Sequence, residues 1–181
     1  TKICTKIFLD NILACVSILF ALNLNLDYVK KRFINFSLPE GRGDIKLIKK
    51  FNKKFKFIDE SYNSNPLSMR AAIKNMNSHK RGPKSKKLAL LGDMLELGKN
   101  SNKLHKELSI SINKSDIDKV YVYGKYIKET FKSLTPSKRG IVFNSLNEAY
   151  SYFGKTIHNN DLLMVKGSNA TGLNNFSKNI K

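Results

Sequence analysis

Residues 55–76 read FKFIDESYNSNPLSMRAAIKNM, a stretch that predicts a buried strand, a polar loop and a helix, in that order. The apolar and aromatic side chains at 55–58 are typical of a strand. Asn65 and Pro66 then supply an N-cap and a proline at the first helical position, so we expect a helix over 66–76.

The same unit recurs towards the C-terminus. Further strands are expected at 88–91, 120–123, 141–143 and 162–165, and further helices at 102–112, 126–134, 146–153 and 173–180. A capping box from Ser145 to Glu148 supports the start of the helix at 146. Because a strand followed by a helix repeats five times, the sequence predicts an α/β fold with a mostly parallel sheet and helices on both faces.

The first 40 residues have a different pattern. The apolar run from Ile12 to Leu22 predicts a helix buried on several sides, starting near Asp10 or Asn11, and a second helix is expected over 27–36. The first run has 11 residues, fewer than the about 20 of a membrane-spanning helix. Proline and glycine at 37–43 then predict a boundary between a domain at 1–40 and one at 41–181.

Composition excludes several classes of protein and leaves the meaning of the charge open. The chain has 181 residues, a net charge of +19 and two cysteines, and 41% of its residues are hydrophobic, which excludes a disordered tail and a disulfide scaffold. The basic residues are 28 Lys and 5 Arg, spread through most expected elements, whereas a dedicated nucleic-acid binder favours arginine on one face. Solvated surface lysine is the favoured interpretation, and two thiols without a signal peptide suit a reducing cytoplasm.

Polar residues cluster where the expected strands end. In open α/β sheets ligands bind outside the carboxyl ends of the strands. The clusters are Asp59–Asn65, Gly92-Asp93, Gly124-Lys125, Asn144-Ser145 and Lys166–Asn169. The Asp59–Asn65 cluster fits either a site for a ribose and a polar substrate or a set of capping turns. The Lys166-Gly167-Ser168 segment is typical of an anion-binding turn. Taken alone, Asp93 and His105 favour structural roles, and the chain has neither a Walker A loop nor zinc-ligand spacing.

Taken together, the order of these motifs resembles one family. Asp59–Ala72, Leu91–Gly98, His105 and Val165–Ser168 resemble the carboxyl-terminal part of the Mur ligases, and Ser61–Pro66 and Leu91–Gly98 resemble in particular the branch that adds D-alanyl-D-alanine. Asn11–Ala14 resembles the start of the last helix of the family's central ATPase domain, and Gly41-Arg42-Gly43 resembles its inter-domain motif. The resemblance implies a Rossmann-like domain at 41–181, preceded by C-terminal helices of the central ATP-binding domain at 1–40.

The activity that the resemblance implies is an ATP-dependent ligation in peptidoglycan precursor synthesis. Such a ligase joins D-alanyl-D-alanine to UDP-N-acetylmuramoyl-tripeptide through an acyl phosphate, with ATP and Mg²⁺. The chain begins with Thr1 and has no P-loop, so we expect a C-terminal portion that is inactive alone. Its expected partners are the two substrates and the missing N-terminal and central domains, which would carry the Mg²⁺ ligands. We expect a cytoplasmic monomer with no nucleic acid and no membrane span.

The resemblance also implies roles for individual residues, while no catalytic residue or metal ligand is assigned within this chain. ATP-binding roles fall to Asn11 at the adenine, Arg42 at the phosphates or ribose, and Glu60 at the ribose. Substrate-binding roles fall to Tyr62, Asn63, Asn65, Lys166 and Ser168. Asp93 and His105 match family positions without an assigned chemical role.

Two alternatives stay open at this point. The net charge of +19 would suit a stand-alone basic Rossmann-like module for nucleotide or nucleic acid. A non-functional remnant that keeps the fold would expose the apolar helix at 12–22.

Overall fold

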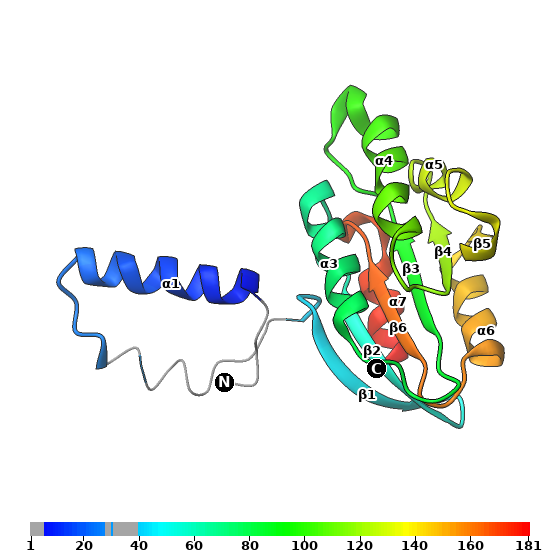
Figure 1. Cartoon of the computed structure of the whole chain (residues 1–181), viewed down its shortest axis with the longest axis horizontal. Helices are drawn as coiled ribbons and strands as arrows, with labels where there is room; N and C mark the ends of the chain where they lie inside the picture. The colour runs from blue at the N-terminus through cyan, green and yellow to red at the C-terminus, as the bar shows by residue number, and fades with distance from the viewer. Residues whose placement is uncertain (1–5, 28–29, 31–39) are drawn as a thin grey trace. The chain divides into compact units, whose positions relative to one another are not determined.

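The computed structural model describes residues 6–27, 30 and 40–181 (Figure 1). The chain divides into two units, Thr1–Pro39 and Glu40–Lys181. In the first unit, helix α1 (Lys6–Ala21) begins about one turn earlier than expected. The second expected helix, over 27–36, lies outside the described residues except at Asp27 and Lys30.

The prediction that the first helix is buried is wrong for this chain. Leu13, Ile18 and Phe20 of α1 are exposed. An apolar helix needs a second surface to cover it, and the described residues of the first unit supply none. Among the described residues, no helix is long and apolar enough to cross a membrane.

The described part of the second unit contains one six-stranded sheet in the order β1-β2-β6-β3-β4-β5. Its strands are β1 (Asp44–Lys50), β2 (Lys53–Glu60), β3 (Lys87–Gly92), β4 (Lys119–Tyr123), β5 (Arg139–Phe143) and β6 (Leu162–Lys166). The five expected strands are confirmed and pair in parallel, so their carboxyl ends meet at one edge.

Strand β1 was not predicted, and it pairs antiparallel with β2. The two strands form a hairpin through Phe51 and Asn52, both at positive φ, as a two-residue primed turn requires. The ring of Phe51 packs edge-on against Tyr150, with 5.1 Å between the ring centroids. Tertiary packing therefore holds a turn that lacks the usual glycine.

Two layers of helices cover the sheet (Figure 1). The helices are α3 (Pro66–Ser78), α4 (Ser101–Asn113), α5 (Ile127–Lys132), α6 (Leu146–Thr156) and α7 (Leu173–Ile180). Helices α3, α4 and α5 pack on one face through residues such as Met69, Leu108 and Ile127. Helices α6 and α7 pack on the other face through residues such as Phe153 and Phe176. Both faces are therefore covered, as predicted.

The cap predicted at Asn65 is confirmed, whereas the capping box predicted at Ser145 is only half formed. Asn65 Oδ1 accepts a hydrogen bond from Ser68 N at 2.8 Å, and the Ser68 hydroxyl accepts one from Asn65 N at 3.0 Å. At α6, Ser145 Oγ accepts from Glu148 N, but the Glu148 carboxylate accepts from Asn144 N instead of Ser145 N. The cap at Asn65 fixes the loop that joins β2 to α3.

Candidate functional site

Glu60 and Lys166 end the neighbouring parallel strands β2 and β6 and lie directly opposite each other in the sheet. Lys166 is buried, and its Nζ lies 3.4 Å from Glu60 Oε2 and donates to the Asn63 carbonyl oxygen at 3.0 Å. Burial raises the pKa of Glu60, although Lys166 opposes the shift. Burial also lowers the pKa of Lys166 against the opposing effect of Glu60. Burial therefore disfavours the charged form of both groups.

Asp59 faces the other side of the sheet, as the alternation of a strand predicts. Its Oδ2 lies 2.7 Å from Nζ of Lys181, the residue after α7, and its Oδ1 accepts from the Ser61 hydroxyl at 2.6 Å. Burial would raise the pKa of Asp59, but the hydrogen bonds from Lys181 and Ser61 outweigh it and lower the pKa. Asp59 therefore ties α7 to the loop after β2.

The Gly41-Arg42-Gly43 turn packs against the end of β2. Arg42 places its guanidinium over the ring of Tyr62, 4.1 Å from the centroid, and Gly43 N donates to the Asp59 carbonyl oxygen at 2.7 Å. Gly43 has φ +89°, and a Cβ there would lie 2.7 Å from Glu60 Oε1. The positive φ favours glycine at this position, and a side chain there would also displace the Glu60 carboxylate.

The loop between β2 and α3 holds Asn63, Ser64 and Asn65. Asn63 Oδ1 accepts from Ser64 N at 2.7 Å, and the Asn65 side chain forms the cap of α3. Ser64 is buried, and among the described residues its Oγ has no hydrogen-bond partner. The sequence reasoning did not single out Ser64. In the sequence, the position of Ser64 between Asn63 and Asn65 was the one indication that it belongs to the site. The lack of a hydrogen-bond partner for its hydroxyl can be known only from the structure.

Ser168 joins this loop to the segment after β3. The Ser168 hydroxyl accepts from Leu95 N at 3.0 Å and donates to the Ser64 carbonyl oxygen at 3.3 Å. Ser168 N also donates to the Asp93 carbonyl oxygen at 3.0 Å. The structure therefore brings the Lys166–Ser168 segment together with the loops after β2 and β3.

Asp93 and His105 are buried and hydrogen-bond to the backbone. The Asp93 carboxylate accepts from Lys125 N at 2.9 Å and from Ile127 N at 2.7 Å, which fixes the start of α5. His105 Nε2 accepts from Met94 N at 2.9 Å, and Nδ1 lies 2.7 Å from the Ser101 carbonyl oxygen. Burial lowers the pKa of His105, so the neutral ring with its proton on Nδ1 fits these contacts. Both residues hold the loops at this edge of the sheet.

A cavity of about 460 Å³ opens at the same edge, beyond β3, β4 and β5. It is lined by Asp93, Leu95, Tyr123, Gly124, Lys125, Lys128, Phe143, Asn144, Ala170 and Thr171. Among the described residues, no group of three or more His, Cys, Asp or Glu side chains could hold a metal ion. Asn11 lies on α1 and is described only within the first unit.

The fold and these motifs agree with known proteins. Residues 45–169 match the family model described as Mur ligase, glutamate ligase domain. The chain belongs to the Mur ligase family. A UDP-N-acetylmuramoyl-tripeptide–D-alanyl-D-alanine ligase of Rickettsia prowazekii is 30% identical over 166 residues, which are 92% of this chain and 35% of that protein. The ligase of the same name from Bacillus subtilis is 31% identical over 126 residues, 68% of this chain and 27% of its own length.

Solved structures of Mur ligases share the fold. The MurF ligase of Thermotoga maritima in complex with ADP matches with a TM-score of 0.72 and 20% identity, over 93% of this chain and 36% of that one. The UDP-N-acetylmuramoylalanyl-D-glutamyl-2,6-diaminopimelate–D-alanyl-D-alanyl ligase from Acinetobacter baumannii matches with a TM-score of 0.76 and 23% identity, over 98% of this chain and 37% of that one. The chain spans about a third of the length of most curated relatives that it matches.

Proposed function

We propose that this chain is the C-terminal part of an ATP-dependent Mur ligase that joins D-alanyl-D-alanine to UDP-N-acetylmuramoyl-tripeptide. The observation that carries the proposal is the contact between the buried Lys166 and the partly exposed Glu60 at the carboxyl ends of adjacent strands, where α/β sheets bind ligands. Relatives of this chain that carry that name support the choice of reaction.

Residues 1–40 would form the end of the central ATP-binding domain. The exposed Leu13, Ile18 and Phe20 on α1 support this assignment, because an apolar helix of this kind needs the rest of such a domain to cover it. The further domains of the longer ligase would supply the P-loop and the Mg²⁺ ligands, and the greater length of the curated relatives supports this assignment. The chain alone would therefore not catalyse ligation, and the whole ligase would act in the cytoplasm.

In this proposal Asn11 would contact the adenine of ATP, Arg42 the phosphates or ribose, and Glu60 the ribose. The position of the Glu60 carboxylate supports contact with the ribose. The carboxylate lies at the end of the strand and is partly exposed, so it can accept hydrogen bonds from the ribose diol. The ring of Tyr62 would hold the Arg42 guanidinium in place for an anion.

The peptide substrates would contact the loops that Lys166 and Ser168 hold together. ATP would transfer its terminal phosphoryl group to the carboxylate of the tripeptide, and the dipeptide amine would then attack the acyl carbon and release phosphate. Tyr62, Asn63 and the unpartnered Ser64 hydroxyl would line this region, and Asn65 would act by fixing the loop through its cap. Closure of the C-terminal domain during the reaction would exclude water from the acyl phosphate.

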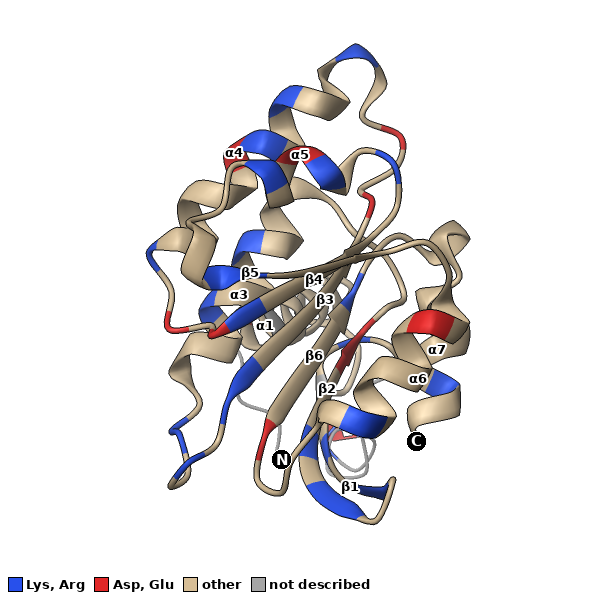
Figure 2. Ribbon diagram, turned by 90° about the vertical axis from the view of Figure 1, so that its right-hand side faces the viewer, with Lys and Arg blue, Asp and Glu red and all other residues tan. Residues whose placement is uncertain are grey.

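A stand-alone nucleic-acid-binding module is less well supported. Figure 2 shows Lys and Arg on strands, helices and connecting loops. A dedicated nucleic-acid surface concentrates basic residues on one face. The distribution instead supports solvated surface lysine.

The test of the proposed function is phosphate release from ATP by the longer protein that contains this chain. We expect release only when both UDP-N-acetylmuramoyl-tripeptide and D-alanyl-D-alanine are present, with L-alanyl-L-alanine as the matched control. Release that needs neither substrate, or that any dipeptide supports equally, would overturn the proposal.

A further inference from the structure

A second cavity lies at the amino ends of the strands, away from the proposed ligase site. Its volume is about 210 Å³. Leu47, Lys56, Leu162 and Lys87 lie in register across β1, β2, β6 and β3 and line one side of it. The loop that contains Lys80–Pro83 lines the other side. This loop begins the basic segment KRGPKSKK at 80–87, which the proposed ligase function leaves unexplained.

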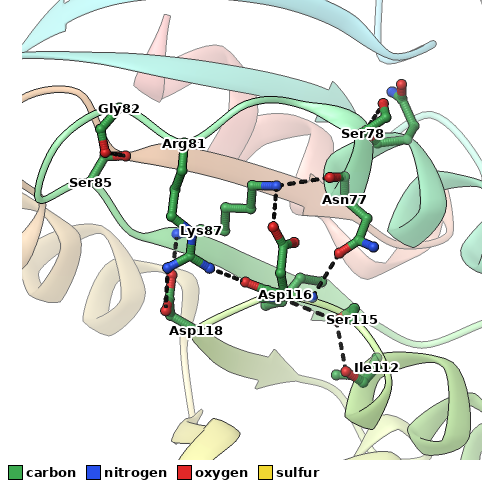
Figure 3. Close-up of polar contacts among 12 residues, drawn as sticks. Asn77, Ser78, Arg81, Gly82, Ser85, Lys87, Ile112, Ser115, Asp116 and Asp118 are labelled. Carbon is green, nitrogen blue, oxygen red and sulfur yellow. Dashed lines mark hydrogen bonds and ion pairs between the residues drawn. The ribbon is translucent and has the colours of Figure 1, made fainter.

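Two of the four cations at this cavity have carboxylate partners. Lys87 is buried, and its Nζ contacts Asp116 Oδ2 at 2.7 Å and the Asn77 carbonyl oxygen at 3.0 Å (Figure 3). Arg81 contacts Asp118 Oδ1 at 2.9 Å and the Asp116 carbonyl oxygen. Lys87 and Arg81 therefore hold the loop in position. Because Asp116 and Asp118 offset their charges, the two residues attract an anionic ligand only weakly.

Lys56 and Lys80 are the other two cations. Both are exposed, and among the described residues neither has a carboxylate partner. Burial lowers the pKa of the neighbouring His79, and the positive charges of Lys56 and Lys87 lower it further. The cavity therefore has an excess of positive charge at its rim.

The other lining groups limit what this charge can bind. Leu47, Leu162 and Pro83 give the cavity an apolar part, while Ser85 and Asn160 add polar atoms. The volume is below the roughly 300 Å³ at which pockets for drug-sized ligands begin. A small ligand with a doubly charged head and a short apolar body fits these properties.

We propose that this cavity is a binding site for a small phosphate monoester. Its phosphate group sits between the ammonium groups of Lys56 and Lys80, and its apolar part rests on Leu47 and Leu162. The site lies at the end of the sheet opposite the Glu60–Lys166 pair, so it does not depend on the proposed ligase reaction.

The test is an NMR titration of the 181-residue chain that follows the His79 ring, with phenyl phosphate and inorganic phosphate as probes at constant ionic strength. We expect saturable binding that raises the pKa of His79, because a bound dianion offsets the nearby lysines. Phenyl phosphate is expected to bind more tightly than inorganic phosphate, because its ring covers the apolar part of the cavity.

Two double variants distinguish binding in this cavity from nonspecific electrostatic attraction to the basic surface. The double variant Lys56→Gln with Lys80→Gln is expected to weaken phenyl phosphate binding roughly tenfold or more. The matched control, Lys99→Gln with Lys103→Gln, removes two exposed lysines elsewhere and should leave binding unchanged. Equal weakening by both variants, tighter binding of inorganic phosphate, or a linear response without saturation would each overturn the proposal.

Discussion

Two buried lysines lie near opposite ends of helix α3, and they differ in what surrounds them. Lys87, at the start of β3, donates to the Asn77 carbonyl oxygen near the C-terminus of α3. Lys166, at the end of β6, donates to the Asn63 carbonyl oxygen just before the N-cap of α3. Both bonds are 3.0 Å long and both lysines are 1% exposed.

The helix dipole distinguishes the two lysines. A cation at a helix C-terminus is favourable, whereas a cation at an N-terminus adds to positive charge that is already there. Lys87 also has Asp116 at 2.7 Å, whereas the carboxylate partner of Lys166 among the described residues is Glu60 at 3.4 Å, a group whose pKa burial raises. We therefore propose that Lys87 stabilises the fold, whereas Lys166 provides positive charge for an anionic substrate.

Replacing Lys87 should have the largest effect on stability. We expect Lys87→Met to lower the free energy of unfolding by about 2–3 kcal/mol, because it leaves the end of α3 without its buried donor. Urea unfolding measures the change, with the exposed Lys86→Met as control. Equal effects of the two substitutions would show that Lys87 is not an anchor.

Replacing Lys166 should have a smaller effect that depends on pH. We expect Lys166→Met to cost about 1 kcal/mol, because Glu60 can take up a proton once its partner is gone. The loss should grow as the pH rises through the pKa of Glu60, which is itself higher without Lys166. A loss of stability as large as that for Lys87→Met, or one independent of pH, would contradict the proposed difference between the lysines at the two ends of α3.

His105 should give a smaller effect, seen as a pH dependence. Its pKa is lowered in the folded protein, so the unfolded chain binds the proton more readily, and stability falls as the pH drops below about 6.5. His105→Gln can still accept the Met94 N–H but does not titrate, so its stability should fall less steeply between about pH 7 and about pH 5. His79, whose pKa is also lowered, contributes to the remaining slope, and Glu60, whose pKa is raised, contributes with the opposite sign. If chemical denaturation shows the same dependence of the free energy of unfolding on pH in both proteins, the neutral state of His105 is contradicted.

Ser64 should give the smallest effect on stability, with the opposite sign. We expect Ser64→Ala to leave the fold equally stable or slightly more stable, within about 0.5 kcal/mol, because its buried hydroxyl has no partner in the described structure. The neighbouring Ser61→Ala serves as control and should be destabilising, since the Ser61 hydroxyl donates to Asp59. Thermal unfolding compares the two, and a clear loss for Ser64→Ala would mean that its hydroxyl is structural.

Much of the fold could be predicted from local patterns. Short apolar strands, the Asn65-Pro66 cap and the Ser145 cap located five strands and the helices after them. Strand β1 could not be found in this way, because its turn at Phe51 and Asn52 lacks the glycine of a primed turn and depends on packing against Tyr150.

The candidate site was only partly predictable. Glu60 and Lys166 could be expected near each other, because parallel strands end at one edge. The contacts of Asp93 and His105 could not, since each binds backbone atoms of a loop whose position depends on the whole sheet. The missing partner of Ser64 likewise depends on what surrounds it in three dimensions.

The most direct test of the central claim is the KM for ATP of the longer ligase with Glu60→Gln, measured beside Lys54→Gln. Both residues point to the same face of β2, Lys54 near the start of the strand and Glu60 at its end. We predict that Glu60→Gln raises the KM for ATP about tenfold with a smaller change in kcat, whereas Lys54→Gln leaves both unchanged. An unchanged KM for Glu60→Gln, or an equal rise for Lys54→Gln, would contradict the assignment of nucleotide binding to the carboxyl ends of the strands.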